Sequence, residues 1–281
     1  MKRTLAIWFV ALCIIASAAM GEEIVVPGFA WHHPGASGNR WSSEVYVTNT
    51  GAEEVSLAVG APIIGRIVQD FPCEPPIRQF TVPPMSTARI PAVTLAASLG
   101  CPDEFVGGLI LNSDGPVMVE TRMTNDRSVN AATPESIVQG YGEEIPGVAW
   151  ADLPHEGVTY MLPGLIWQPN PGICGSPRFE TAVAYANPNT FDVTVTFLNL
   201  PSGPLDASLN GKPVRTPFTI TVGAMRWVQI QIGPPQVGGE VCSDPQVFDL
   251  FFQVTGPIGC FASVVDRTTQ DPRTVMPVPV S

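Results

Sequence analysis

The stretch WSSEVYVTNTGAEEVSLAV, residues 41–59, returns 138 positions later as FETAVAYANPNTFDVTVTF, residues 179–197. In both copies, apolar side chains occupy the odd-numbered positions on either side of a central polar segment. This alternation is typical of strands that bury one face. The central segments, NTG at 49–51 and NPN at 187–189, consist of residues that favour tight turns. Each copy is therefore predicted to form a strand, a tight turn and a second strand as a hairpin.

The repeat extends well beyond this stretch. The spacing Pro-Gly-x-x-Trp occurs at residues 27–31 and again 136 positions later at 163–167. Later in each copy an apolar run, a Gly-Pro turn and a second apolar run predict another hairpin, for example over residues 106–123. We expect about six or seven strands in each copy, and their spacing along the chain is typical of a β-sandwich.

The length and the first residues set the domain boundaries. The chain has 281 residues, and it begins with Lys2, Arg3 and an apolar run, followed by small residues, as a secretory signal does. The predicted segments are a signal peptide at 1–21 and β-sandwich repeats at 22–150 and 151–281. We therefore expect export to the extracellular space, the periplasm or the cell surface. No later run reaches the roughly 18 apolar residues of a membrane helix, so no membrane span is predicted.

The composition limits the classes of partner. Charged residues make up only 14% of the chain, the formal net charge is -11, and Lys212 is the only lysine after the leader. With 26 glycines and 30 prolines the chain is rich in turns. An acidic surface repels polyanions, so nucleic acid and anionic membranes are not expected partners.

Five cysteines remain after the leader, and an oxidising compartment favours disulfides between them. Within the first copy only Cys73 and Cys101 are available to pair. In the second copy Cys242 occupies the repeat position of Cys101, and we pair it with Cys174, although Cys260 competes for the same partner. If Cys174 pairs with Cys242, Cys260 is left as a thiol in an apolar strand, where a buried, inert cysteine is the simpler reading.

A set of short motifs carries a family resemblance. The pattern R-[WF]-x-[ST]-x-[VA]-x-[VY]-x-N occurs at 40–49 and 178–187, followed by RMTN at 122–125, GYGEEIP at 140–146 and a closing VVDRTTQDP at 264–272. Together these resemble a tandem β-sandwich repeat of secreted bacterial proteins. The resemblance implies export, an immunoglobulin-like architecture and no established activity. The expected fold is thus all-β, with two tandem immunoglobulin-like antiparallel β-sandwich domains after a signal peptide.

The usual signatures of catalysis and metal binding are absent from the sequence. It contains no Gly-x-Ser-x-Gly, His-Glu-x-x-His, phosphate-loop or Cys-x-x-Cys motif. The three histidines are His32 and His33, adjacent in a Gly/Pro-rich region, and the distant His155. We therefore predict no catalytic, cofactor-binding or metal-binding residues, and we expect a protein that is not an enzyme.

The best candidates for ligand or partner contact are matched residues of the two copies. Trp31 and Trp167 end equivalent Pro-Gly-x-x-Trp segments, and Arg40 and Arg178 precede equivalent strands. A pair of tryptophans on tandem domains could stack on sugar rings or anchor a partner. The competing interpretation of the tryptophans is that their indoles fill the open end of each sandwich core. That of the arginines is that they make internal ion pairs or stack on neighbouring aromatic rings.

Three functions follow from these observations. We favour a non-catalytic structural or adhesive module at the cell surface or in the extracellular space, with a protein or glycan partner. The alternative is a carbohydrate-binding or accessory protein that uses exposed tryptophans, which buried indoles would exclude. A secreted hydrolase comes third, because its carboxylate pair would be defined only in space.

Overall fold

The computed structural model of the chain is built from β-strands. It describes residues 21–34, 40–66, 79–91, 94–95, 104–126, 142–167, 179–200, 208–209, 212–213, 215–233, 246–266 and 272–280. Among them, the one short 3-10 turn with defined bounds is η2 (Trp150–Asp152). The predicted signal peptide lies almost wholly outside the described residues. No described helix is long and apolar enough to cross a membrane.

Two antiparallel sheets come from residues 22–149, here called the first half. Sheet A has the order β10 (Val148–Ala149), β1 (Glu22–Trp31), β7 (Phe105–Ser113), β4 (Val55–Arg66), β5 (Gln79–Val82). Sheet B has the order β2 (His33–Pro34), β3 (Arg40–Asn49), β8 (Val117–Asp126), β9 (Gly142–Pro146), and β6 (Thr87–Pro91) also pairs with β3.

Two further antiparallel sheets come from residues 159–280, the second half. Sheet C has the order β16 (Phe218–Val222), β13 (Val193–Phe197), β18 (Gln246–Val254), β11 (Thr159–Trp167), β21 (Val278–Val280). Sheet D has the order β15 (Lys212–Pro213), β14 (Ser208–Leu209), β17 (Trp227–Gly233), β12 (Phe179–Ala186), β19 (Gly259–Asp266), β20 (Pro272–Val275).

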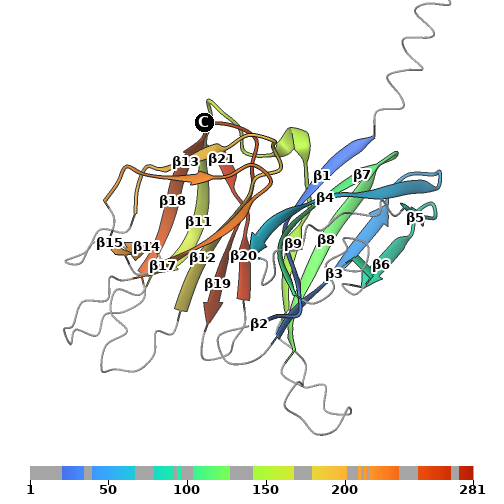
Figure 1. Ribbon diagram of the computed structural model, residues 1–281, viewed down its shortest axis with the longest axis horizontal. Coiled ribbons are helices and arrows are strands. Elements are labelled where there is room, and N and C mark those ends of the chain that lie inside the picture. The colour runs from blue at the N-terminus through green and yellow to red at the C-terminus, as the bar shows by residue number, and fades with distance from the viewer. Residues whose placement is uncertain are drawn as a thin grey trace, which may run out of the picture.

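The expected all-β class is confirmed, but the expected pair of immunoglobulin-like sandwiches is wrong. The strands form four small antiparallel sheets in a propeller-like arrangement. Figure 1 shows the sheets of the two halves side by side. Consecutive strands repeatedly pass from one sheet to another: β3 belongs to sheet B and β4 to sheet A, and β7 belongs to sheet A and β8 to sheet B.

Both predicted hairpins fail for the same physical reason. The turn at residues 49–51 leads from β3 in sheet B to β4 in sheet A, and the turn at 114–116 leads from β7 in sheet A to β8 in sheet B. Each turn therefore joins two facing sheets instead of two paired strands. Alternating apolar residues indicate a strand with one buried face, but they do not indicate which sheet that strand joins.

The internal repeat of the sequence is present in the strand order. When the two-residue strands β2, β14 and β15 are left out and the remaining strands of the two halves are matched in chain order, sheets A and C have the same strand order. The same matching converts β9-β8-β3-β6 of sheet B into β20-β19-β12-β17 of sheet D. Even the irregularity between Val26 and Phe29 in β1 recurs between Leu162 and Leu165 in β11.

A buried asparagine holds the first turn of each half. Asn49 is fully buried, donates from Nδ2 to the carbonyl oxygen of Val82 at 3.0 Å, and accepts from the Gly51 amide at 2.8 Å. Asn187 is also fully buried and donates to the carbonyl oxygen of Val222 at 2.9 Å. A side-chain amide can satisfy several backbone groups at once, which explains this residue type at a turn between sheets.

Two main apolar cores stabilise the halves. The first lies between sheets A and B, and the second between sheets C and D. The largest fully buried side chains include Phe29 and Phe105 in the first core, and Tyr185, Phe197 and Phe252 in the second. Burial of one such side chain contributes about 1.5–3 kcal/mol to folding. These cores use one face of each sheet and leave the other face for contacts.

The disulfide prediction is not supported by the described part of the chain. Cys73, Cys101, Cys174 and Cys242 all lie outside the described residues. The one described cysteine, Cys260, is a buried free thiol, so that part of the chain holds no disulfide. Burial raises the pKa of this thiol well above its ordinary value, as expected for a cysteine packed among apolar side chains. The structure therefore agrees with the expected buried thiol at Cys260.

Candidate functional site

The structure describes the side chains of two predicted contact residues, and they belong to different sheets. Trp31 ends β1 of sheet A opposite Phe105, and Arg40 begins β3 of sheet B opposite Asp126. The half-buried indole of Trp31 packs against the first core. It also stacks on the ring of His32, with centroids 3.8 Å apart and planes 17° from parallel. One face of the indole is thus already covered.

The other two predicted contact residues belong to the second half. Trp167 ends β11 and pairs through its backbone with Gln246 of β18 in sheet C. Arg178 lies outside the described residues. The matched pair of tryptophans therefore occupies equivalent ends of β1 and β11, while a joint role in binding stays a prediction.

The outer face of sheet B is a polar surface that the sequence analysis did not identify. Along β3 the odd-numbered side chains from Ser43 to Asn49 are buried, and the even-numbered ones are partly exposed. We call the following set the sheet-B face: Ser42, Glu44, Tyr46 and Thr48 on β3, Arg89 on β6, Glu120, Arg122 and Thr124 on β8, and Glu144 on β9.

The strand register sets these side chains beside one another. Tyr46 lies between Arg89 of β6 and Glu120 of β8. Glu44 lies opposite Arg122, which in turn lies opposite Glu144 of β9 in the same antiparallel sheet. Directly opposite pairs in a sheet are close enough for their side chains to interact. Each of these two cross-strand rows therefore contains both acidic and basic side chains, and the first row also contains the aromatic ring of Tyr46.

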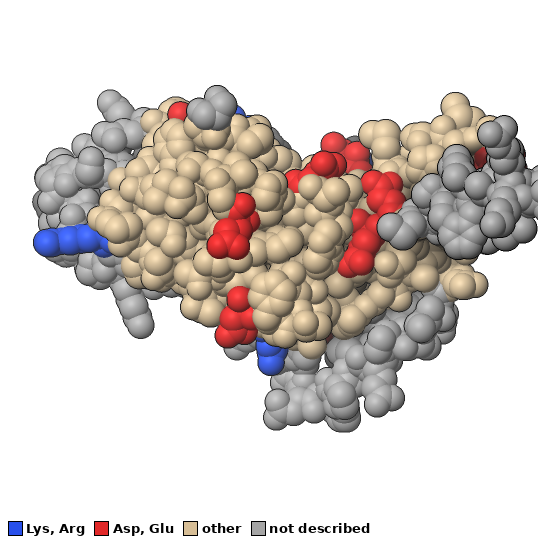
Figure 2. Space-filling view, turned by 90° about the horizontal axis from the view of Figure 1, so that it is seen from above, with Lys and Arg blue, Asp and Glu red and all other residues tan. Residues whose placement is uncertain are grey.

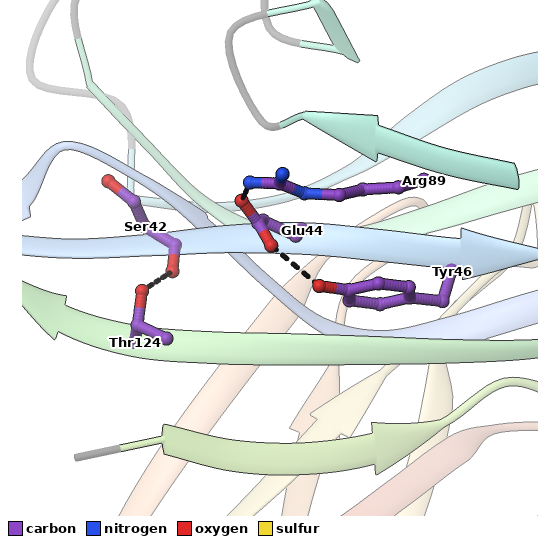
Figure 3. Close-up of polar contacts among 5 residues, drawn as sticks. All are labelled: Ser42, Glu44, Tyr46, Arg89 and Thr124. Carbon is purple, nitrogen blue, oxygen red and sulfur yellow. Dashed lines mark hydrogen bonds and ion pairs between the residues drawn. The ribbon is translucent and has the colours of Figure 1, made fainter. Parts of the chain in front are cut away.

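Glu44 is the centre of a hydrogen-bonded triad (Figure 3). Its carboxylate accepts from the Arg89 guanidinium and from the Tyr46 hydroxyl, the latter at 2.8 Å. The bond from Arg89 is the main cause that lowers the pKa of Glu44, while partial desolvation opposes it. The same carboxylate raises the pKa of the Tyr46 phenol. Glu44 is therefore held as a carboxylate, and both partners are held in fixed orientations.

Figure 3 also shows a second contact on this face, from Thr124 of β8 to the backbone of β3. Thr124 Oγ1 donates to the carbonyl oxygen of Ser42 at 3.2 Å. The Arg89 side chain is 60% exposed and that of Glu44 28% exposed, so the triad is accessible to a ligand. Groups fixed on rigid strands lose little conformational entropy when they bind, which favours recognition.

The corresponding face of the second half has a different chemistry. At the positions of Glu44 and Tyr46, offset by 138, β12 carries Ala182 and Ala184. Ala184 is buried and packs with Phe261 and with residues of the first half. The sheet-B face could have been found in the sequence by comparing these positions, because only the first copy has large polar residues there.

On the face of the molecule shown in Figure 2, acidic side chains are spread over the described surface and basic ones are sparse. This distribution agrees with the formal net charge of -11. The described residues contain no group of three or more histidine, cysteine or acidic side chains placed to hold a metal ion. The sheet-B face, with Arg89 and Arg122 beside Glu44 and Glu120, thus has mixed charge on an otherwise acidic molecule.

Comparison with known proteins leaves the resemblance noted in the sequence as an expectation. No protein-family model, curated protein or solved structure matches this chain.

Proposed function

We propose that this protein is a non-catalytic, exported binding module that contacts a protein or glycan partner through the sheet-B face. The observation that carries the proposal is the triad of Glu44, Tyr46 and Arg89, fixed on an open sheet face. The extracellular space or the cell surface is the proposed location, because it follows from the signal-like leader.

The chemistry of the triad defines the groups that it would recognise. The Tyr46 ring offers an apolar surface for a sugar ring or an aliphatic side chain, and its hydroxyl is already oriented by Glu44. Arg89 and Arg122 match carboxylates, while Glu120 and Glu144 accept hydrogen bonds from hydroxyl or amino groups. A glycan or a polar protein surface supplies all of these groups.

The alternative that uses exposed tryptophans has less support. The half-buried Trp31 indole packs on the first core and has one ring face covered by His32, so less of the ring is open to a sugar. No described residue gives a specific reason to favour the secreted hydrolase. Tyr46, rather than Trp31, is the aromatic residue that we assign to binding.

The test is a binding screen of the mature protein against glycans and extracellular-matrix proteins, followed by variants of the triad. We expect Tyr46→Ala and Arg89→Ala each to weaken binding by about tenfold or more, as for residues at the centre of a contact. Glu54→Ala, an exposed position outside the face, is the control and should bind like the wild type. Equal affinity of all three variants for the captured partner would show that binding occurs elsewhere.

A further inference from the structure

The two halves of the molecule contact each other through different surfaces. The outer face of sheet D, in the second half, packs against the outer face of sheet A and also against Met123 and Ile145 of sheet B, in the first half. Figure 1 shows the two halves side by side. Trp227 Nε1 donates to the carbonyl oxygen of Pro27 at 2.8 Å, and the Ile64 amide donates to the carbonyl oxygen of Met225 at 2.9 Å. A contact between unlike surfaces of two repeats is a heterologous, head-to-tail contact.

Because the halves share one strand order, each of these two surfaces occurs twice in the molecule. The first half has its own version of the sheet-D surface, namely the sheet-B face with the turn at residues 83–86. The second half has its own version of the sheet-A surface, which is the outer face of sheet C. We call the following set the sheet-C face: Thr194 and Thr196 on β13, Thr219 and Thr221 on β16, and Val247, Asp249, Phe251 and Gln253 on β18.

The turn at Met85 keeps the conformation that its counterpart uses in the internal contact. Met85 has a φ of 49° and Met225 a φ of 53°, values that are uncommon for residues other than glycine. The Met85 amide donates to the carbonyl oxygen of Gly51 at 3.2 Å, and the Met225 amide to that of Asn189 at 3.0 Å. Met225 packs against the first half, whereas Met85 is 76% exposed. Met85 thus has the same left-handed backbone as Met225 and occupies the equivalent turn, but its side chain is exposed.

We infer that the sheet-B face and the Met85 turn of one molecule dock on the sheet-C face of a second copy of this chain. The inference rests on the proposed function, because it names a partner for the same face. The internal contact is its template: Met85 takes the role of Met225, and the sheet-C face takes the role of the outer face of sheet A.

The side chains on the two faces make this contact weaker and more polar than the internal one. Glu44 and Tyr46 stand where the internal contact has Ala182 and Ala184, so the two sheets lie farther apart. The sheet-C face offers hydroxyl and amide groups as partners, including Thr196 and Gln253, which are opposite each other across β13 and β18. The exposed side chain of Val247 adds an apolar contact for Met85. Association is therefore reversible and rises with concentration.

A heterologous contact allows a test with two complementary variants. Met85→Asp removes the docking group of one surface, and Val247→Asp places a charge on the other; both residues are exposed, 76% and 72%, so both variants should fold. In sedimentation velocity over a concentration series, the wild-type mature protein is expected to form dimers and longer chains. Each variant alone should remain a monomer. An equimolar mixture of the two should form dimers and nothing longer, because each variant supplies the surface that the other lacks.

Two results would overturn the inference. One is a wild-type protein that stays monomeric at the highest concentration reached, and the other is a mixture of variants that forms no dimer. The proposed function has a separate readout, the binding screen with Tyr46→Ala. If the wild type is monomeric and the screen still identifies a partner whose binding depends on Tyr46, only the self-association fails. If self-association occurs and no other partner binds, the second copy is the partner.

Discussion

The hydroxyl of Thr274 in the second half lies 3.1 Å from Glu143 Oε1 and 2.6 Å from the carbonyl oxygen of Glu144, both in the first half. A hydroxyl has one proton to donate. The Thr274 hydroxyl therefore shares its one proton between two acceptors, the Glu143 carboxyl group and the Glu144 carbonyl oxygen. Burial raises the pKa of Glu143 to about 7, and hydrogen bonds from Ser263 and Thr274 only partly oppose it.

The stability of the protein should therefore fall as the pH rises through about 7. The folded state keeps the Glu143 proton between its ordinary pKa of 4.5 and about 7, whereas the unfolded chain releases it. The stabilisation is complete below pH 4.5 and is lost as the pH rises to about 7, with a difference of about 3 kcal/mol from this group. Urea unfolding at pH 5 and pH 8 measures it. Glu143→Gln should remove this part of the pH dependence, and Glu144→Gln, at an exposed neighbour, should leave it.

Gly28 is predicted to set the distance between the halves. A Cβ at this position would lie 2.7 Å from Ile145 Cδ1 and 2.9 Å from the Phe261 ring. Gly28→Val should therefore force the halves apart and lower the unfolding free energy by about 1–3 kcal/mol, as overpacking does. Gly142→Ala is the control, because its added Cβ would meet the flexible Arg122 side chain at 3.3 Å. Equal thermal stability of the two variants would contradict this assignment.

Both buried asparagines should be sensitive to substitution. Asn49→Ala removes the donor to the buried carbonyl oxygen of Val82, and Asn187→Ala removes the donor to that of Val222. An unsatisfied buried polar group costs about 1–3 kcal/mol, so each variant should lose at least that much in denaturant unfolding. Asn112→Ala, at an exposed position, should change little. A loss for only one asparagine would show that the two turns are not equivalent.

Cys260 should be unreactive in the folded protein. Its thiol is 1% exposed, and burial raises its pKa well above the ordinary value, so the reactive thiolate is scarce. Peptide mapping by mass spectrometry after alkylation at pH 8 should find Cys260 unmodified in native protein and modified in urea. Rapid modification without denaturant would mean that the second core opens on the time scale of the reaction.

The sequence predicts the strands and the repeat well, but not how the strands combine into sheets. Val45, Val47, Val183 and Tyr185 alternate with polar or small residues, and each is fully buried on the inner face of its sheet. The same alternation would arise whether the turn at 49–51 paired two strands or joined two sheets. The partners of β3 lie more than 30 positions away, because Thr48 lies opposite Thr87 of β6 and Met118 of β8.

The sheet-B face could not be predicted from residues shared by both copies, because its central residues occur in only one of them. Trp31, by contrast, is shared by both copies. Its contact with His32 depends on a left-handed backbone at His32, with a φ of 48°, and this conformation could not be predicted from the sequence. Tyr46 differs between the copies, as its counterpart is Ala184. In a repeat protein, positions that differ distinguish a free face from one used between repeats.

The interleaving of strands has a consequence for synthesis of the chain. β1 pairs with β7 and with β10, so Ile24 meets Leu111 and Ala149. A ribosome must release 87 residues after Ile24 before β1 can pair with β7, and 125 before it can pair with β10. Until β7 has been made, the apolar segment of β1 has neither of these strands to pair with, which leaves it open to aggregation. A chaperone that binds extended apolar segments would find its first target in residues 24–31.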